Sequence, residues 1–518
     1  MSTRGQVIRN TLFSSVGIYT EYFLGMLTSI IIARHLGPAD FGAYSLVIWL
    51  VATGVAITNS GVASAVIRFI AELRGAGRES QIRSLLAWAW RVQAGFLAVV
   101  LLGGTALFLV QGQRLMPGFN HGILLAILLL TTALRASYML NVGIAKGFEN
   151  FRATAVIAVI VAPLNLLLIL VAWWLDGPME WFLGTFTISS FVFWWISRRQ
   201  VASLLPPPQP REALDGDTRR RLRSYTALVA VTVAVNFITA SEVEVLFLTL
   251  FDSAASAGKF KVAFQLSSGA LLLVPGVFGA LLLPMMANAL AQGREVASRR
   301  LSMSTTYLTA LAAPLVAFGV LFASDIIGLL YGAAYAPAAF VFAGCLAAGA
   351  VATASQAASS YLLGADRQRM LMVVILAFAA VKLVLDVVLI RRYGLTGAVV
   401  AFAATSVLSN ALLMVLALRY SGSRLEWGRM TRVLAAACIA GAIAWALKGL
   451  LPPNHLLVLA LGGITLTGVY AVATLLLGFW SAPDLQHFQQ MHARFAGGRP
   501  AFVARALGWA VRRSEALA

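Results

Sequence analysis

Charged residues are scarce in this 518-residue sequence, at 11% of the total, and only 20 positions are acidic. A soluble globular protein carries about 25% charged residues, because its surface needs them. A chain with 60% apolar residues and a mean hydropathy of +0.85 does not cover such a surface. The composition therefore excludes a soluble enzyme, a nucleic-acid-binding protein and a disordered chain, and it predicts a membrane protein.

Cysteine is almost absent as well. Cys345 and Cys438 lie far apart in apolar stretches, and neither has a Cys or His neighbour at the spacing of a metal site. A nucleotide-binding loop is also missing, since Gly258-Lys259 is followed by Phe260 where Ser or Thr would be required. We therefore expect no bound metal or cofactor and no ATP hydrolysis. Coupling to protons or sodium ions is the alternative source of energy.

Long apolar runs fill most of the chain. A membrane-spanning helix needs about 20 mostly apolar residues, and lipid excludes open sheet edges. The sequence therefore predicts an all-α polytopic membrane protein with about 14 transmembrane helices. The predicted segments are 10–33, 41–67, 85–110, 123–147, 153–175, 181–197, 225–250, 259–290, 302–330, 337–363, 370–390, 395–418, 431–450 and 456–478.

The basic residues predict how these helices are oriented. If the N-terminus is cytoplasmic, the cytoplasmic loops and both tails hold 29 of the 39 Lys and Arg residues. The outer loops then hold seven, among them Lys259 and Lys261, and three more lie inside predicted helices. This asymmetry follows the positive-inside rule. We expect a multi-pass protein of the bacterial cytoplasmic (inner) membrane with both termini in the cytoplasm.

The two halves of the chain carry related loop residues. The register that aligns Gly42 with Gly258 also aligns Gly77-Arg78-Glu79 with Gly293-Arg294-Glu295. Such marks indicate a duplicated six-helix unit, and parallel repeats are a transporter architecture. The predicted organisation is an N-terminal lobe (1–202), a Pro/Arg-rich cytoplasmic linker (203–223), a C-terminal lobe (224–420), two extra helices (421–479) and a basic amphipathic tail (480–518).

A motif joins the first two predicted helices. The residues from Ile32 to Tyr44 read IARHLGPADFGAY, and the next predicted helix ends with Arg68 and Glu72. This opening resembles that of the polysaccharide transporters, or Wzx-type O-antigen flippases, of the multidrug/oligosaccharidyl-lipid/polysaccharide (MOP) exporter superfamily. The resemblance implies two six-helix lobes in a V, as in MATE transporters. It also implies a central cavity lined by helices one, two, seven and eight, and export of a lipid-linked glycan.

Arg135 lies near the middle of the bilayer, because it is twelve residues, or roughly 18 Å, beyond the start of segment 123–147. Tyr138 and Asn141 follow on about the same helix face. A guanidinium at this depth is suited to hold the diphosphate of a polyprenyl carrier or an acidic sugar. The alternative is an arginine that fixes helix packing.

Lys382 and Asp386 are four residues apart in segment 370–390, on one helix face. They form either an intrahelical ion pair or a cavity cation that is tuned by its carboxylate. The hypothesis of an anion carrier depends on Arg135 and Lys382, because both are expected to line the central passage.

Acidic residues inside predicted helices are candidates for ion coupling. Glu21 lies about mid-bilayer, where it either binds a proton or pairs with a partner such as Arg135. Glu242 and Glu244 point to different sides of segment 225–250, so only one of them faces a cavity. The candidates for ion coupling are therefore Glu21, Glu242 and Asp386.

Four further residues have weaker cases. Arg68 and Arg91 lie near the cytoplasmic interface, where snorkelling to the headgroups is favoured over contact with substrate. Pro275 and Gly276 interrupt segment 259–290 and are hinge candidates.

Three functions fit these observations. The first is a flippase, not an enzyme, that moves a polyprenyl-diphosphate-linked oligosaccharide to the outer leaflet by alternating access, in partnership with glycan polymerase and export machinery. The second is a cation-coupled multidrug exporter of the same superfamily. The third is a membrane glycan polymerase or ligase, which the short outer loops disfavour because they run only about ten residues.

Overall fold

The chain is helical throughout the part that the structure describes. The computed structural model describes the backbone of residues 4–205, 212–240, 243–272 and 276–496, with Arg505, Gly508, Trp509, Val511 and Arg512. Side chains are described within these ranges except at 4–19, 21, 151–155, 158, 234–240, 276–280, 491 and 494–496. The described ranges contain α1 to α18 and two short 3₁₀ helices, and no strand. The predicted all-α fold is confirmed.

Eight helical stretches in the described part are long and apolar enough to cross a membrane. They include α3 (Ile82–Leu115), α4 (His121–Gly147), α11 (Arg294–Leu321), α16 (Trp427–Leu450) and α17 (His455–Leu476). Each of the predicted segments falls mainly on helix in the structure. On α3, large apolar side chains such as Leu102 and Val110 are exposed, as expected of a helix that faces lipid.

Two long helices each contain a pair of predicted segments. In α1 (Arg4–Thr58) the backbone leaves helical geometry at Gly37, with φ 73°, and Pro38 begins the second leg. In α15 (Gln368–Ser421) the break is at Gly394, with φ 53°. Glycine adopts a positive φ without a steric penalty, and proline suits the first turn of a helix. The turn predicted around Gly37 and Pro38 is therefore confirmed.

The chain folds into two compact units. Unit 1 contains residues 1–265 and 379–398, and unit 2 contains residues 266–378 and 399–518. Residues 224–265 and 379–398, which the sequence assigns to the C-terminal lobe, thus pack within unit 1. The lobe boundaries at 202 and 420 stay predictions about the internal duplication.

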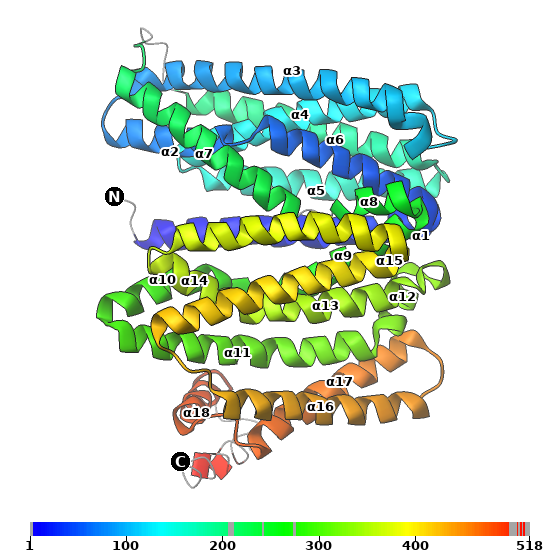
Figure 1. The fold of residues 1–518 in the computed structure, drawn as a ribbon, viewed down its shortest axis with the longest axis vertical. Coiled ribbons are helices and arrows are strands. Elements are labelled where there is room, and N and C mark those ends of the chain that lie inside the picture. Colours follow the sequence, from blue (N-terminus) through cyan, green and yellow to red (C-terminus); the bar gives the residue numbers. More distant parts are fainter. Residues whose placement is uncertain are drawn as a thin grey trace. The chain divides into compact units, whose positions relative to one another are not determined.

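Unit 1 is built around α4. This helix packs against α6 (Met179–Leu204) and α2 (Val62–Gly75), while α5 (Phe151–Trp174) packs against α1 and α6 (Figure 1). A core of fully buried apolar side chains joins α2, α3 and α4, and includes Phe69, Leu85 and Ile144. The unit also holds α7 (Gly216–Ala240), α8 (Val243–Phe251) and the first part of α9 (Ala254–Leu272).

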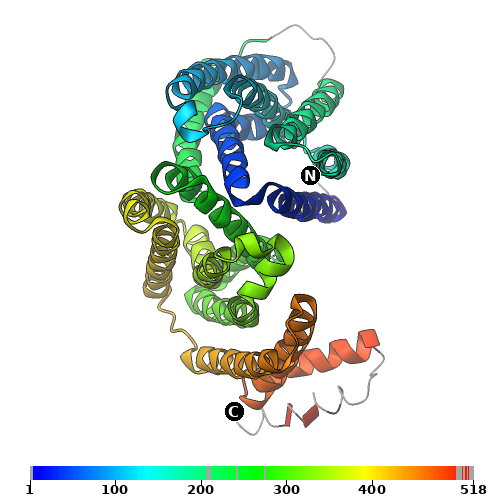
Figure 2. The ribbon, with the colours of Figure 1, turned by 90° about the vertical axis from the view of Figure 1, so that its right-hand side faces the viewer.

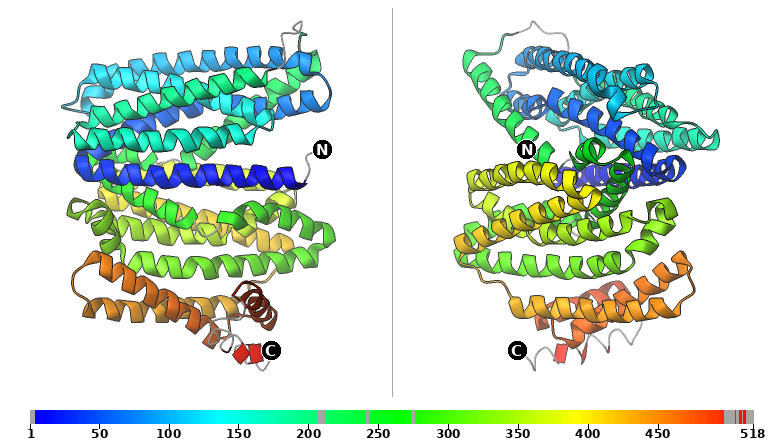
Figure 3. Two further views of the ribbon diagram at one scale, coloured as in Figure 1. Left: turned by 180° about the vertical axis from the view of Figure 1, so that it is seen from behind. Right: turned by 45° about the vertical axis from the view of Figure 1, so that its right-hand side comes forward.

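Unit 2 is built around α11. This helix packs against α13 (Ala338–Ala354) and α16, and α10 (Gly276–Gln292) packs against α14 (Gln356–Gly364). The last two long helices, α16 and α17, form an orange hairpin in Figure 2. The hairpin is followed by α18 (Ala482–Ala496), seen in dark red in the left view of Figure 3. The short α12 (Ala323–Tyr331) contacts α13 and α17.

One crossing in unit 1 brings two backbones into direct contact. A Cβ atom on Gly42 would lie 1.7 Å from the Ala254 carbonyl oxygen, and one on Gly258 would lie 2.2 Å from the Pro38 carbonyl oxygen. The contact is reciprocal, because the register that aligns Gly42 with Gly258 also aligns Pro38 with Ala254. Equivalent residues meet in this way across a two-fold relation. The crossing therefore supports the internal duplication.

Candidate functional site

A cavity of about 330 Å³ lies in unit 1 between the two legs of α1 and the start of α9. Three helix faces converge on it, since the lining residues recur at spacings of three, four and seven. They are Gly25, Thr28, Ser29 and Ile32 on the first leg of α1, Phe41, Tyr44, Ser45 and Ile48 on the second, and Lys261 and Gln265 on α9. These elements correspond to predicted helices one, two and eight.

Gln265 fixes the walls of this cavity to one another. The Tyr22 hydroxyl donates a hydrogen bond to the Gln265 backbone oxygen at 2.9 Å. The Ser29 hydroxyl donates to the Gln265 side-chain oxygen at 3.0 Å. On the second leg of α1, the Phe41 and Tyr44 rings stack with their centroids 5.9 Å apart. The cavity is thus bordered by hydroxyl, amide and aromatic groups, and such a mixture of apolar surface and placed polar groups is usual in ligand-binding sites.

Lys261 is the cation of this cavity, and the sequence analysis placed it in an outer loop. The structure begins α9 at Ala254, so Lys261 lies in the second turn of the helix and lines the cavity. One signal was available. The register of the duplication pairs Lys261 with Ser45, which lines the same cavity from α1.

Arg135 lies between α4 and α6. Its Nε donates to the Ser190 hydroxyl at 3.0 Å, and its guanidinium carbon is 4.3 Å from the centroid of the Phe186 ring and 5.1 Å from that of Phe193. It does not line the cavity of α1 and α9. The contacts of Arg135 with α6 are those expected of an arginine that fixes helix packing.

Tyr138 and Asn141 also contact α6. The Tyr138 ring packs against Phe193 with centroids 4.8 Å apart. The buried Asn141 amide donates to the Ser197 hydroxyl at 2.9 Å. Neither side chain lines the cavity of α1 and α9, and contact of this helix face with substrate stays a prediction.

A buried ion triad is a second feature of unit 1. The Lys382 ammonium on α15 lies 2.9 Å from Asp386 Oδ2 on the same helix and 2.7 Å from Glu244 Oε1 on α8. The exposed fractions of Glu244, Lys382 and Asp386 are 1%, 4% and 0%. Asp386 Oδ1 accepts no hydrogen bond from the described residues. With all three groups ionised, the triad carries one net negative charge away from water.

The triad contains the predicted ion pair of Lys382 with Asp386. The sequence did not connect Glu244 with this pair, although it was one of two acidic candidates on its helix. Neither Lys382 nor Arg135 lines the cavity of α1 and α9, whose cation is Lys261. Contact of Lys382 or Arg135 with substrate stays a prediction.

The remaining candidates lie elsewhere. Arg68 is exposed, with its guanidinium 4.6 Å from the centroid of the Tyr225 ring, and Arg91 is exposed and donates to the Ala87 backbone oxygen at 3.0 Å. Neither lines the cavity, in keeping with the favoured snorkelling role. Glu242 and Pro275, with the side chain of Glu21, lie outside the described residues. Gly276 is the first residue of α10, and its surroundings are not described either.

Comparison with known proteins shows the family. The polysaccharide biosynthesis protein family matches residues 7–290, which is more than half of the chain. The chain belongs to this family. No curated protein sequence matches it.

Solved structures show which fold this polysaccharide biosynthesis protein has. The lipid II flippase MurJ in its inward closed conformation gives a TM-score of 0.68 at 13% identity, over 89% of this chain and 98% of MurJ. An inward-facing multidrug resistance transporter of the MATE family gives 0.62 at 11% identity, over 79% of this chain and 98% of that one. A MOP superfamily transporter from Pyrococcus furiosus gives a TM-score of 0.53 at 14% identity, over 80% of this chain and 95% of that one.

The predicted polysaccharide family is therefore confirmed, as is the multi-pass helical fold, which is the fold of these MOP superfamily transporters. At these identities the structural likeness concerns the fold alone. Family and fold together describe a multi-pass helical membrane protein of polysaccharide biosynthesis.

Proposed function

We propose that the chain is a flippase that moves a polyprenyl-diphosphate-linked oligosaccharide from the cytoplasmic to the outer leaflet of the inner membrane. The observation that carries this proposal is the cavity between α1 and α9, where Lys261 lies among hydroxyl and amide groups. A diphosphate does not cross hydrocarbon unaided, whereas a cation can neutralise it and polar groups can replace its hydration. The isoprenoid chain stays in the bilayer while the head passes through the protein.

The lining of the cavity also distinguishes this function from drug export. Cationic drugs are held by carboxylates and by aromatic rings. The cavity of α1 and α9 offers the rings of Phe41 and Tyr44, but none of the ten residues that line it is acidic. The single charged group in that lining is Lys261. The sign of its charge favours an anionic substrate over a cationic one.

The Glu244–Lys382–Asp386 triad is our proposed coupling site. An unbalanced buried charge is costly, and two carboxylates that share one ammonium lower this cost by binding one proton between them. A proton that is taken up on one side of the membrane and released on the other would couple the triad to alternating access. This proposal replaces Glu21 and Glu242 with Glu244, and keeps Asp386 from the original candidates.

Deletion of the gene tests the proposed function. If the chain is the flippase, lipid-linked oligosaccharide accumulates in the deletion strain and faces the cytoplasm, so a glycan-directed label applied to inside-out vesicles reaches it. Normal surface glycan in the deletion strain, together with lost drug resistance, would contradict the proposal and favour the multidrug exporter.

The coupling proposal has its own test in proteoliposomes. Transport by the wild-type protein should increase when a pH gradient is imposed. The Asp386→Asn variant should lose this response while it retains slow transport down a substrate gradient. A response to a sodium gradient and not to pH would contradict proton binding at the triad.

A further inference from the structure

A polar pocket of about 530 Å³ lies in unit 2, between the first turns of α11 and the segment that joins α15 to α16. Its lining includes two arginines, Arg299 and Arg424, two glutamates, Glu295 and Glu426, and three serines. The pocket is at the start of the apolar span of α11, and the basic residues predict that this end faces the cytoplasm. It is thus at the depth of the lipid headgroups.

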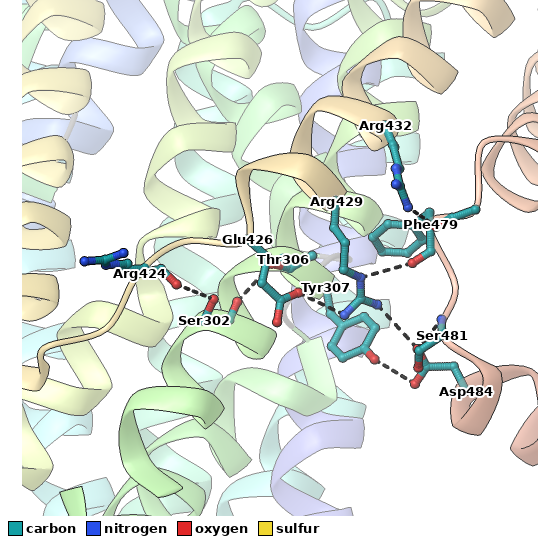
Figure 4. A network of polar contacts seen from close by, with 11 residues as sticks. Ser302, Thr306, Tyr307, Arg424, Glu426, Arg429, Arg432, Phe479, Ser481 and Asp484 are labelled. Carbon is teal, nitrogen blue, oxygen red and sulfur yellow. Dashed lines mark hydrogen bonds and ion pairs between the residues drawn. The ribbon is translucent and has the colours of Figure 1, made fainter. Parts of the chain in front are cut away.

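Hydrogen bonds hold the joining segment on α11. The Ser302 hydroxyl donates to the Arg424 backbone oxygen at 3.0 Å, and the Ser423 hydroxyl donates to the Ser298 backbone oxygen at 3.0 Å. Arg294 donates to the backbone oxygens of Tyr420 and Ser421 at 2.6 and 3.2 Å. The backbone at Arg424 is therefore fixed, and Figure 4 shows its side chain pointing away from the neighbouring polar cluster.

Two guanidinium groups of the pocket are available to a ligand. Glu426 is held by Arg429, whose Nη1 donates to its carboxylate at 2.9 Å (Figure 4). The guanidinium groups of Arg299 and Arg424 form no ion pair or hydrogen bond with another residue in the described part of the chain. Both arginines are exposed, and together they suit an anionic group that accepts charge-assisted hydrogen bonds from each of them.

An apolar groove continues from this pocket along the same helices. It has a volume of about 680 Å³ and lies between α11, α13, the second leg of α15 and α16. The α11 face that reaches the polar pocket at Ser302 continues into the groove at Thr305, Thr309 and Ala312. Leu425 follows Arg424 directly and lines the groove. From Thr305 to Leu321 the groove extends about 24 Å, longer than the ~15 Å half-thickness of the hydrocarbon core.

We propose that the pocket and the groove together bind one anionic glycerophospholipid. Its phosphodiester would lie on Arg299 and Arg424, and an acyl chain would fill the groove. A phosphodiester has two anionic oxygens, which can accept charge-assisted hydrogen bonds from the two guanidinium groups. Small side chains, among them Ala312, Ala437 and Gly441, leave the width for a hydrocarbon chain. This lipid is distinct from the transported substrate, and its binding does not depend on the proposed function.

Lipid retention during purification tests the proposal. The full-length protein is extracted from membranes, and bound lipids are identified by native mass spectrometry. We expect a retained anionic glycerophospholipid in the wild-type protein and about tenfold less in the Arg299→Gln/Arg424→Gln variant, because each arginine contributes charge-assisted hydrogen bonds. Arg300→Gln is the matched control, since Arg300 is exposed on α11 and lines neither cavity.

A second variant tests the groove. Ala437→Phe fills it without a change in charge, and we expect the same loss of lipid with the polar pocket intact. Retention that is unchanged in both variants would overturn the proposal, as would equal retention of neutral phospholipids. Retention of a polyprenyl phosphate would assign the site to that lipid. Inorganic phosphate would be the ligand if, in lipid-free detergent, it protects the wild-type protein from thermal unfolding and does not protect the Arg299→Gln/Arg424→Gln variant.

Discussion

Gly42 and Gly258, which occupy equivalent positions in the two halves of the chain, make the same contact with each other's helix. A Cβ atom on either one would lie 3.0 Å from the backbone nitrogen of the other, and closer still to a carbonyl oxygen. The helices that begin near Pro38 and Ala254 therefore touch through their backbones. The cavity that holds Lys261 begins within one turn of this crossing.

Substitution of Gly42 by alanine should separate the two helices. The added methyl group would overlap the Ala254 carbonyl, and overpacking of this kind costs about 1–3 kcal/mol. Thermal unfolding in detergent should show a lower midpoint for Gly42→Ala. Gly103→Ala is the control, because nothing lies within 4 Å of a Cβ at that helical position. Equal midpoints for Gly42→Ala and the wild-type protein would contradict the backbone contact.

Lys382 should be essential for stability. Lys382→Met leaves the carboxylates of Glu244 and Asp386 buried together without a counter-ion, at a cost of about 3–5 kcal/mol. The triple variant Lys382→Met/Glu244→Gln/Asp386→Asn removes all three charges and should recover most of the lost stability. Membrane yield and unfolding midpoint measure both effects. A stable Lys382→Met protein would show that the triad does not balance charge as described.

Asp484 should fix the C-terminal helix to unit 2 across the physiological pH range. Its carboxylate accepts hydrogen bonds from the Tyr307 hydroxyl at 2.7 Å and from the Ser481 hydroxyl at 2.6 Å, and lies 3.4 Å from Arg429 (Figure 4). Burial opposes ionisation, but the hydrogen bonds from Ser481 and Tyr307 and the charge of Arg429 outweigh it, so the pKa of Asp484 is below its ordinary value.

Because the pKa of Asp484 is lowered, the stability of its contacts depends on pH only in the acidic range. The stabilisation is complete above the ordinary carboxyl pKa of about 4 and is lost only as the pH falls through the lower folded value. Limited proteolysis at α18 should therefore be constant between about pH 5 and 8. Asp484→Asn should increase cleavage throughout that range, because loss of these hydrogen bonds lowers the stability of the α18 contact by about 1–3 kcal/mol. Increased cleavage of the wild-type protein between pH 8 and 6 would contradict this assignment.

The sequence predicted the helices because an apolar run of about 20 residues has few other structures open to it in lipid. It also placed the turn at Gly37 and Pro38 and offered the ion pair of Lys382 with Asp386 as one of two alternatives, since both depend on residues close together in the chain. It did not predict that Glu244 joins this pair, because that contact links two helices that are distant in sequence. For the same reason the sequence did not predict the contacts of Arg135, because Ser190, Phe186 and Phe193 lie on α6.

Hydropathy predicts a helix that begins at residue 259, and this puts Lys261 at the outer end of the helix, where it counts with the loop cations. Residues 252–258 are too polar to begin an apolar segment, yet α9 starts at Ala254. The reciprocal crossing explains the difference, since small residues such as Ala254 and Gly258 let the helix start against another backbone. The register of the duplication was a better guide to this position than hydropathy.

The most direct test of the account is the transport of lipid-linked glycan by Lys261 variants in a strain that lacks the wild-type gene. Lys261→Ala should leave the glycan facing the cytoplasm at normal membrane levels of the protein, and Lys261→Arg should restore part of the export. Lys259→Ala is the matched control, because Lys259 lies on the same helix and does not line the cavity. Full export by Lys261→Ala would contradict the account.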